Sequence, residues 1–147
     1  MKFWEKFWKL VSKKDLVFVT LIFVAVIVFS FFESANKVKV EFGETAVDVQ
    51  APRYSLNIPY EMVESMELAE IAEPGDTDKG RDDMVTRVGL WKNDTWGEYY
   101  ACIDLQTTQC IVVHLNDGRI FVFSRKNDEE TSAIFETFQS HLDGLKN

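Results

Sequence analysis

The feature that most constrains this chain is an uninterrupted apolar run near its N-terminus. Residues 16–32 read LVFVTLIFVAVIVFSFF and contain no charged residue, Gly, Pro or amide side chain. As a helix, this run would be roughly 25 Å long, close to the thickness of the hydrocarbon core of a bilayer. A strand so long and so uniformly apolar is not expected in a domain of this size. The run therefore predicts a transmembrane helix over residues 15–32.

The residues ahead of this run, MKFWEKFWKLVSKK, mix lysine with aromatic side chains. On a helix, one side would be apolar and would contain Phe3, Trp4, Phe7, Trp8 and Val11. An aromatic, lysine-rich helix beside a membrane span is typical of an interfacial anchor, with rings at the acyl boundary and ammonium groups toward anionic lipid. Residues 1–14 are therefore predicted to be a cytoplasmic interfacial segment, and residues 1–32 to contact the lipid bilayer.

The distribution of lysine predicts the orientation of the span. Five lysines precede the apolar run, whereas only Lys37 and Lys39 follow it closely. Positive residues stay on the cytoplasmic side, so we expect a single-pass protein of the cell membrane with a cytoplasmic N-terminus and an extracytoplasmic C-terminal domain. A cleavable signal peptide is the alternative. Against it, the run is longer than the usual apolar region of a signal, and Glu33 stands where cleavage needs a small residue.

The rest of the chain is predicted to be a linker, residues 33–40, and one domain, residues 41–147. The first fifteen residues carry five lysines together with Glu5 and Asp15, which gives them a charge of +3. Since the formal net charge of the whole chain is −8, the remaining residues have a charge of −11. Such an acidic surface repels phosphate backbones, and this excludes nucleic acid as a partner.

The domain reads as a series of strands followed by one helix. Apolar and polar residues alternate at period two in VKVEF and AVDVQ, YSLNI reads as a further strand, and four apolar-rich runs follow the loop AEPGDTDKGRDD. We expect those four strands to be consecutive and antiparallel, with a hairpin turn at Asn116-Asp117-Gly118. In the last segment Asn127 and Glu130 form a capping pair. The apolar stripe of this helix contains Ile134, Phe135, Phe138, His141, Leu142 and Leu145.

Several strings in this domain resemble the bacterial pleckstrin-homology-like domains. They are the IPY turn within YSLNIPYEMVESMEL, the strand RVGLWKN, the hairpin DGRIFVFS and the helix start DEET. The resemblance covers roughly residues 38–145 and implies an α+β fold, in which an antiparallel β-barrel or sandwich is capped by a C-terminal α-helix. Phosphoinositide-binding members of that superfold carry a basic patch in the first hairpin. Here the early strands carry Glu41, Glu44 and Asp48, so phosphoinositide binding is not expected.

Two features of the domain suggest a binding site. The loop offers hard carboxylate ligands for a metal such as calcium, although it is not an EF-hand loop and a solvated connection is the simpler interpretation. Its candidate ligands are Asp76, Asp78, Asp82 and Asp83. Aromatic side chains gather around the turn in GLWKNDTWGEYY, where they would either form a binding surface or fill the core. They are Trp91, Trp96, Tyr99 and Tyr100.

The two cysteines, Cys102 and Cys110, flank LQTTQ, a predicted hairpin turn. If the two strands pair, these residues could face each other and form a disulfide outside the cytoplasm, or remain two buried thiols. They have no metal-site spacing with His.

The chain contains no motif of a known catalytic site. His114 stands alone on a predicted strand, and His141 stands alone on the stripe of the predicted helix. No nucleophile elbow, zinc-protease motif or phosphate loop occurs in the sequence. We therefore predict no enzyme, no catalytic residues and no cofactor. The predicted function is binding or scaffolding in an envelope protein assembly, with a protein partner. The alternative is a sensor of calcium or of a glycan, and an enzyme is the less favoured third possibility.

Overall fold

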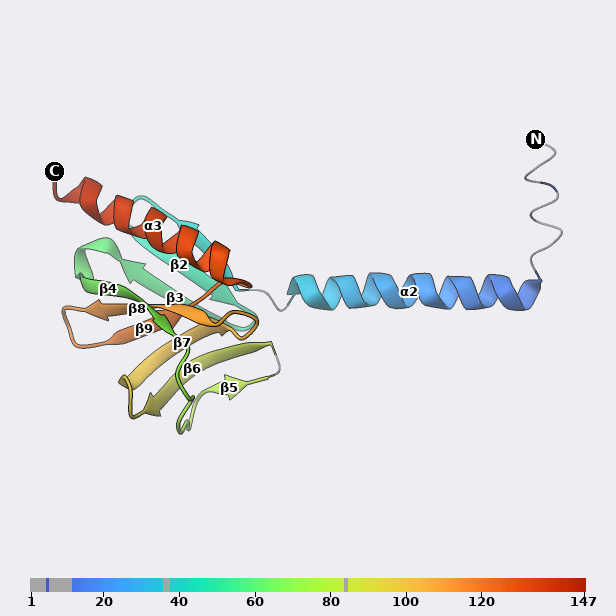
Figure 1. The fold of residues 1–147 in the computed structure, drawn as a ribbon, viewed down its shortest axis with the longest axis horizontal. Helices are drawn as coiled ribbons and strands as arrows, with labels where there is room; N and C mark the ends of the chain where they lie inside the picture. The colour runs from blue at the N-terminus through green and yellow to red at the C-terminus, as the bar shows by residue number, and fades with distance from the viewer. Residues whose placement is uncertain (1–4, 6–11, 36–37, 84) are drawn as a thin grey trace. The chain divides into compact units, whose positions relative to one another are not determined.

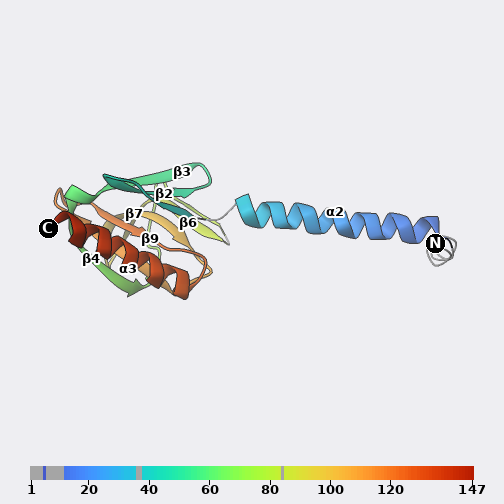
Figure 2. The ribbon, with the colours of Figure 1, turned by 90° about the horizontal axis from the view of Figure 1, so that it is seen from above.

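The chain divides into two compact units in the computed structural model, which describes residues 5, 12–35, 38–83 and 85–147. The first unit covers residues 1–35 and the second covers residues 36–147. Figures 1 and 2 show the second unit as two β-sheets and a helix. The two hydrophobic clusters of buried residues both lie in this second unit.

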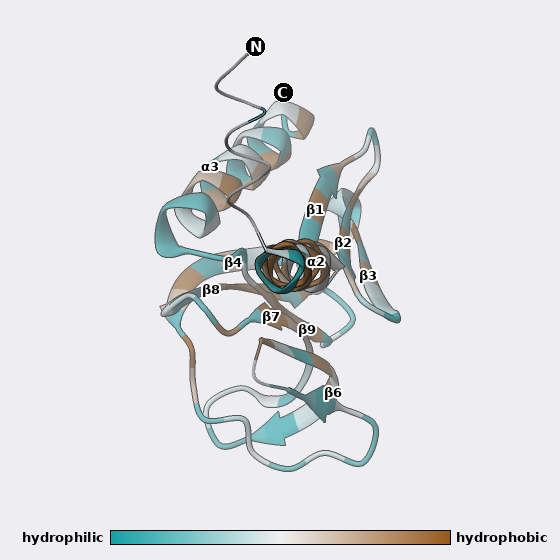
Figure 3. Cartoon of the chain, turned by 90° about the vertical axis from the view of Figure 1, so that its right-hand side faces the viewer, coloured by the Kyte–Doolittle hydropathy of each residue, from teal (hydrophilic) through white to brown (hydrophobic). Residues whose placement is uncertain are grey.

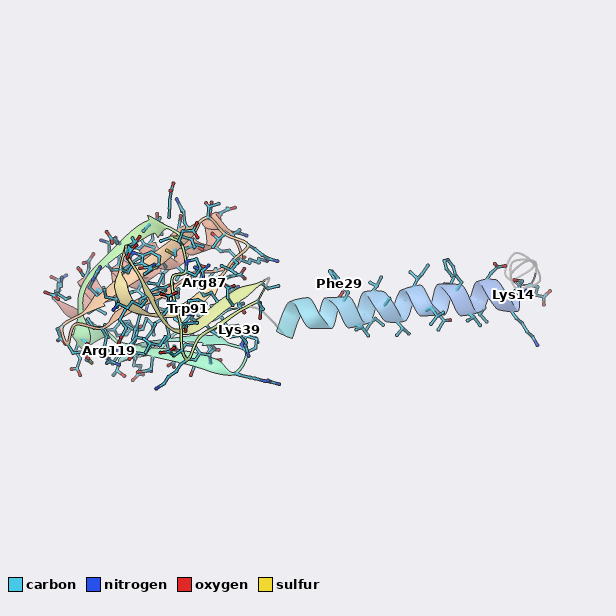
Figure 4. The ribbon with its side chains drawn as sticks, turned by 90° about the horizontal axis from the view of Figure 1, so that it is seen from below. Lys14, Phe29, Lys39, Arg87, Trp91 and Arg119 are labelled. Atoms are coloured by element: carbon cyan, nitrogen blue, oxygen red, sulfur yellow. The ribbon has the colours of Figure 1, made fainter. Side chains whose placement is uncertain are left out.

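Helix α2, Lys13–Ala35, is the main element of the first unit. Its apolar side chains are exposed and spread around the whole circumference, as the brown helix in Figure 3 and the side chain of Phe29 in Figure 4 illustrate. A helix that is apolar on all sides is normally surrounded by apolar groups. The predicted interfacial segment 1–14 lies mostly outside the described residues.

Within the described residues, no helix is both long enough and apolar enough to cross a membrane. Helix α2 begins with three charged residues, Lys13, Lys14 and Asp15, so its first turn is not apolar. The predicted transmembrane helix over 15–32 is therefore wrong for this part of the chain, and the location in the cell membrane that depended on it is corrected with it.

The first sheet has three antiparallel strands in the order β1-β2-β3. Alternating residues of β2 and β3, such as Val47, Val49 and Ile58, are buried, because a strand points successive side chains to opposite faces. The strands are β1 (Lys39–Phe42), β2 (Ala46–Ala51) and β3 (Tyr54–Pro59).

The second sheet has six strands in the order β4-β8-β9-β7-β6-β5. Four of its pairs are antiparallel, but β7 and β9 are parallel. The predicted turn at 116–118 is confirmed, since it joins the antiparallel strands β8 and β9. The strands are β4 (Val63–Glu70), β5 (Arg81–Asp82), β6 (Thr86–Asn93), β7 (Gly97–Asp104), β8 (Gln109–Leu115) and β9 (Ile120–Phe123).

The two sheets correct the predicted architecture. A mixed α+β fold is present, but the strands within the described residues form no closed barrel. Between β3 and β4 the chain makes a short 3-10 helix, Tyr60–Met62, which begins after Pro59 and separates the two ladders of hydrogen bonds. The four later strands are also not a simple antiparallel series, because β9 folds back between β7 and β8.

Helix α3, Asp128–Leu145, closes the first core, which lies between the two sheets. The predicted cap is confirmed, since the side chain of Asn127 accepts a hydrogen bond from the backbone N–H of Glu130 at 2.8 Å. Phe138 is fully buried and packs edge-on against Phe42 and Tyr60, with 6.1 Å between ring centroids in each case. His141 and Leu145 are exposed, so the apolar stripe is buried only in part.

The second core lies on the opposite face of the six-stranded sheet. Strands β4 and β5 form opposite edges of this sheet, so the segment 71–80 that joins them runs from one edge to the other, as Figure 1 shows. We call these residues the crossing segment. Its backbone pairs with the sheet where Asp76 and Lys92 exchange two hydrogen bonds of 2.9 Å. The second core contains Trp91, Tyr99, Ala101, Ile103, Cys110, Val112 and Val122.

Candidate functional site

Two of the four aromatic residues singled out in the sequence, Trp91 and Tyr99, are buried in the second core. Trp91 is 7% exposed and its indole N–H donates a hydrogen bond to the carbonyl of Val88 at 3.0 Å. Tyr99 is inaccessible to solvent, and its hydroxyl donates to the carbonyl of Pro74 at 2.8 Å. That hydrogen bond ties the crossing segment to strand β7. Burial raises the pKa of Tyr99 above its ordinary value, so the hydroxyl keeps its proton and remains a donor.

The other two aromatic residues lie on different faces of the sheet. Trp96 is half-buried and packs edge-on against Tyr99, with 5.0 Å between ring centroids. Tyr100 faces the first core and packs against Phe121 at 5.3 Å. The structure therefore brings three of the predicted residues together as packing around the second core and separates the fourth from them.

A buried arginine, Arg87, lies beside this cluster and was missed by the sequence reasoning. It is 6% exposed, its Nε is 3.1 Å from a carboxylate oxygen of Asp82, and its guanidinium lies 5.7 Å from the ring centroid of Trp91 (Figure 4). It also donates to the carbonyl of Ala72 at 3.3 Å. Arg87 thus joins β5, β6 and the crossing segment. The signal in the sequence was a charged residue inside the apolar strand RVGLW.

Of the four acidic residues proposed as metal ligands, Asp76 and Asp78 line one groove together, whereas Asp82 and Asp83 have partners of their own. Asp82 pairs with Arg87, and the backbone of Asp76 pairs with Lys92. Asp83 accepts hydrogen bonds from the backbone N–H groups of Val85 and Thr86 at 2.8 and 2.7 Å. Burial acts to raise the pKa of Asp83, but these hydrogen bonds outweigh it and lower the pKa. Among the described residues, no three His, Cys, Asp or Glu side chains are grouped so that they could hold a metal ion.

The two cysteines are free and buried. Cys102 on β7 belongs to the first core and Cys110 on β8 to the second core, so their side chains lie on opposite faces of the six-stranded sheet. Strand β9 lies between β7 and β8. The predicted hairpin between them is therefore absent, and the structure does not bring the two thiols together. Burial raises the pKa of each thiol to about 12, which keeps both protonated.

One further candidate site was not predicted from the sequence. It is a groove of about 470 Å³ between strand β4 and the C-terminal half of α3, which we call the β4–α3 groove. Tyr60 also lines it, and Gln139 on the helix and Ser65 on the strand contribute polar groups. Its apolar lining consists of Val63, Met66, Leu142 and Leu145.

Leu145 gives this groove an apolar side chain in contact with solvent. It is 61% exposed, and the other exposed large apolar side chains of the described residues all belong to α2. Met66 and Leu142 lie deeper and pack against the first core. The groove therefore combines a floor that is anchored in the core with an accessible apolar wall.

The rim of the β4–α3 groove is acidic. Three carboxylates line the groove, those of Glu61, Glu64 and Asp143, and its lining contains one basic residue, Lys146. Among the described residues, none of these three carboxylates takes part in an ion pair. Residues 36–147 contain 11 basic and 21 acidic residues, so the groove lies on a unit with a formal charge of −10. Its electrostatic potential favours a cationic ligand.

A second groove, lined by β1 and the N-terminal half of α3, is less suited to a ligand. Its arginine is already paired within the domain, since Arg125 lies 3.2 Å from Glu130. The remaining lining residues include Lys39 and Glu41, which have opposite charges. This groove therefore presents no unbalanced charge, in contrast with the β4–α3 groove.

Comparison of the chain with protein-family models, with curated proteins and with solved structures gave no match. The resemblance to pleckstrin-homology-like domains thus stays a prediction. The observations that bear on function are those of the groove itself: an apolar lining, an acidic rim and a position beside the edge strand β4.

Proposed function

We propose that this chain is a protein-binding module whose β4–α3 groove holds an extended segment of a partner protein. The observation that carries the proposal is the position of the groove beside β4, the terminal strand of the six-stranded sheet. A groove between an open sheet edge and a helix is a recurring way to bind a peptide. The exposed Leu145 and the core-anchored Met66 supply apolar contacts for it.

The groove fits an extended peptide better than a compact small molecule. Its volume of about 470 Å³ is within the range of ligand pockets, but it lies along an open strand and is bordered by exposed charged side chains. The alternatives of a calcium sensor and of a glycan sensor have less support. Among the described residues the four aspartates form no group that could hold a metal ion, and Trp91 and Tyr99 are buried in the second core.

A displayed library of random 12-residue peptides tests this proposal without assuming a ligand sequence. The bait is the full chain, kept monomeric by a mild detergent because α2 exposes apolar side chains. We expect selected peptides to slow amide hydrogen exchange in β4 and in the last two turns of α3. Selection of no peptide, or protection elsewhere in the domain, would contradict the proposal.

A pair of variants locates the binding on the groove. Leu145→Glu places a charge on the exposed apolar wall and should abolish capture of the selected peptides, whereas Glu136→Gln on the same helix lies outside the groove and should leave capture unchanged. Leu145 is exposed, so the substitution should not unfold the domain. Equal capture by both variants would place the binding site elsewhere.

A further inference from the structure

The outer edge of β4 carries backbone groups that are arranged to receive another strand. Ile71 donates its N–H to the carbonyl of Thr108 at 2.9 Å, and Leu68 is opposite Ile111 in the same register. In an antiparallel pair, residues that exchange hydrogen bonds alternate with residues whose N–H and C=O point away. The amide groups of Met66, Leu68 and Glu70 therefore point to the outer edge, where no strand of the described residues pairs with them.

The side chains of β4 determine which side chains an added strand can carry. Met66 and Leu68 pack on the side of the first core and of α3, whereas Ala69 contributes to the second core on the other side. A strand added along β4 would place every second side chain over the β4–α3 groove and the others on the opposite face. Apolar side chains fit the first set of positions, because Leu142 and Leu145 lie there.

The charge of β4 excludes a second copy of this chain as the added strand. The strand VESMELAE carries Glu64, Glu67 and Glu70, and two such strands side by side would bring rows of like charge together. Glu61 and Asp143 add further negative charge at the groove. A lysine- or arginine-bearing segment would instead find opposite charges along the whole edge.

Resting on the proposed function, we infer that the ligand is a basic segment of another protein, with alternating apolar and cationic residues, which pairs with β4 as a seventh strand of the sheet. Main-chain hydrogen bonds to β4 supply part of the affinity, the apolar side chains occupy the groove, and the cations lie on the opposite face of β4, which carries Glu67. The bulge in the register between Val63 and Ser65 ends regular pairing, so the added strand runs along residues 66–70.

A set of nine-residue peptides tests this inference on the full chain in mild detergent, with binding followed by fluorescence anisotropy. A peptide of alternating valine and lysine should bind, and one of alternating valine and glutamate should bind at least tenfold more weakly. Glu67→Lys should weaken the valine–lysine peptide about fivefold, since it reverses the charge on the face of β4 that the lysines meet, whereas Glu136→Lys makes the same change outside the groove and should have little effect.

Backbone methylation separates strand addition from side-chain binding. Only every second N–H of an added strand points to its neighbour. One peptide is methylated on the backbone nitrogen of every valine and a second on the backbone nitrogen of every lysine. The affinities of these two peptides should therefore differ by more than tenfold. In an antiparallel pair, the two residues that exchange hydrogen bonds have their side chains on the same face of the sheet. The peptide residues that bond to β4 would then be the valines over the groove, so methylation of the valine nitrogens would abolish binding. A parallel pair would make the methylated lysines the weaker ligand.

The outcomes also separate this inference from the function on which it rests. Equal affinity of the two methylated peptides, or preference for the valine–glutamate peptide, would overturn the inference. If library peptides still protect the β4–α3 groove in that case, the chain remains a protein-binding module whose ligand is not an added basic strand. If library peptides bind elsewhere, the proposed function fails as well.

Discussion

The two cores of this domain use the same sheet in different ways. The first core is covered by a second sheet and by α3, so that apolar side chains such as Ile58 and Phe138 face it from three elements. The second core is covered on its far side largely by the crossing segment, whose attachment includes polar bonds from Tyr99 and Arg87. Regular elements can bury a face by apolar packing alone, whereas an irregular segment also needs hydrogen bonds for its own backbone.

This comparison predicts different responses when each core is disturbed. The first core should depend mainly on the volume of its side chains, and the second on its polar attachments. Both cores lie within residues 36–147, so stability can be measured by urea unfolding of this unit, which we expect to fold without residues 1–35.

The largest effect is expected from Phe138→Ala in the first core. Phe138 is fully buried and contacts the rings of Phe42, Tyr60 and Phe123, so the substitution leaves a cavity among them. We expect the free energy of unfolding to fall by about 3–5 kcal/mol. Phe135→Ala, on the same helix but half-buried, should cost clearly less. Equal losses would mean that α3 does not close the first core as described.

A smaller loss is expected from Arg87→Met in the second core. The variant keeps much of the apolar stem but removes the hydrogen bonds to Asp82 and to the carbonyl of Ala72. Asp82 is partly exposed and can be rehydrated, so we expect a loss of about 2 kcal/mol in the free energy of unfolding. Limited proteolysis should then cut the crossing segment first. Lys79→Ala, an exposed change in that segment, provides the control, and an equal effect there would argue against the role of Arg87.

A still smaller effect is expected from Tyr99→Phe, which removes one hydroxyl and leaves the ring. The carbonyl of Pro74 loses its donor, and the free energy of unfolding should fall by about 1 kcal/mol. Hydrogen exchange should increase in the crossing segment while β1–β3 stay unchanged. A uniform increase over the whole domain would show that the two cores are not separable in this way.

The smallest effect concerns pH and the start of α3. The carboxylate of Asp128 accepts hydrogen bonds from the hydroxyls of Thr107 and Thr108 and from the backbone N–H of Thr108, and these lower its pKa from 3.8 to about 2. Because the pKa of Asp128 is lower in the folded than in the unfolded state, its carboxylate stabilises the folded protein at any pH above the unfolded-state pKa. This stabilisation is lost as the pH falls from about 4 to 2. Asp128→Asn should therefore reduce stability at pH 7 and flatten its decline in this range, as thermal unfolding would show. An unchanged decline would assign the acid sensitivity to other carboxylates.

Local features of the sequence predicted the elements that depend on near neighbours. The helix cap at Asn127, the turn at 116–118 and the alternating strands β1 and β2 were all predicted, because capping, turn conformation and alternation are properties of a few adjacent residues. The apolar stripe of α3 also identified Phe138 as a core residue. The mixed α+β class follows from the same signals.

Tertiary structure alone decided how these elements pair. Nothing in the chain around Cys102 and Cys110 indicates that β9 inserts between their strands, because the parallel pairing of β7 with β9 joins segments that are separated by a whole strand and two turns. The same long-range pairing leaves β4 at the edge of the sheet and places Met66 beside Leu142, more than seventy positions later in the chain. The sequence by itself therefore determined which residues form strands, helices and turns. The β4–α3 groove exists only because non-local contacts selected one strand order among many that the same local preferences allow.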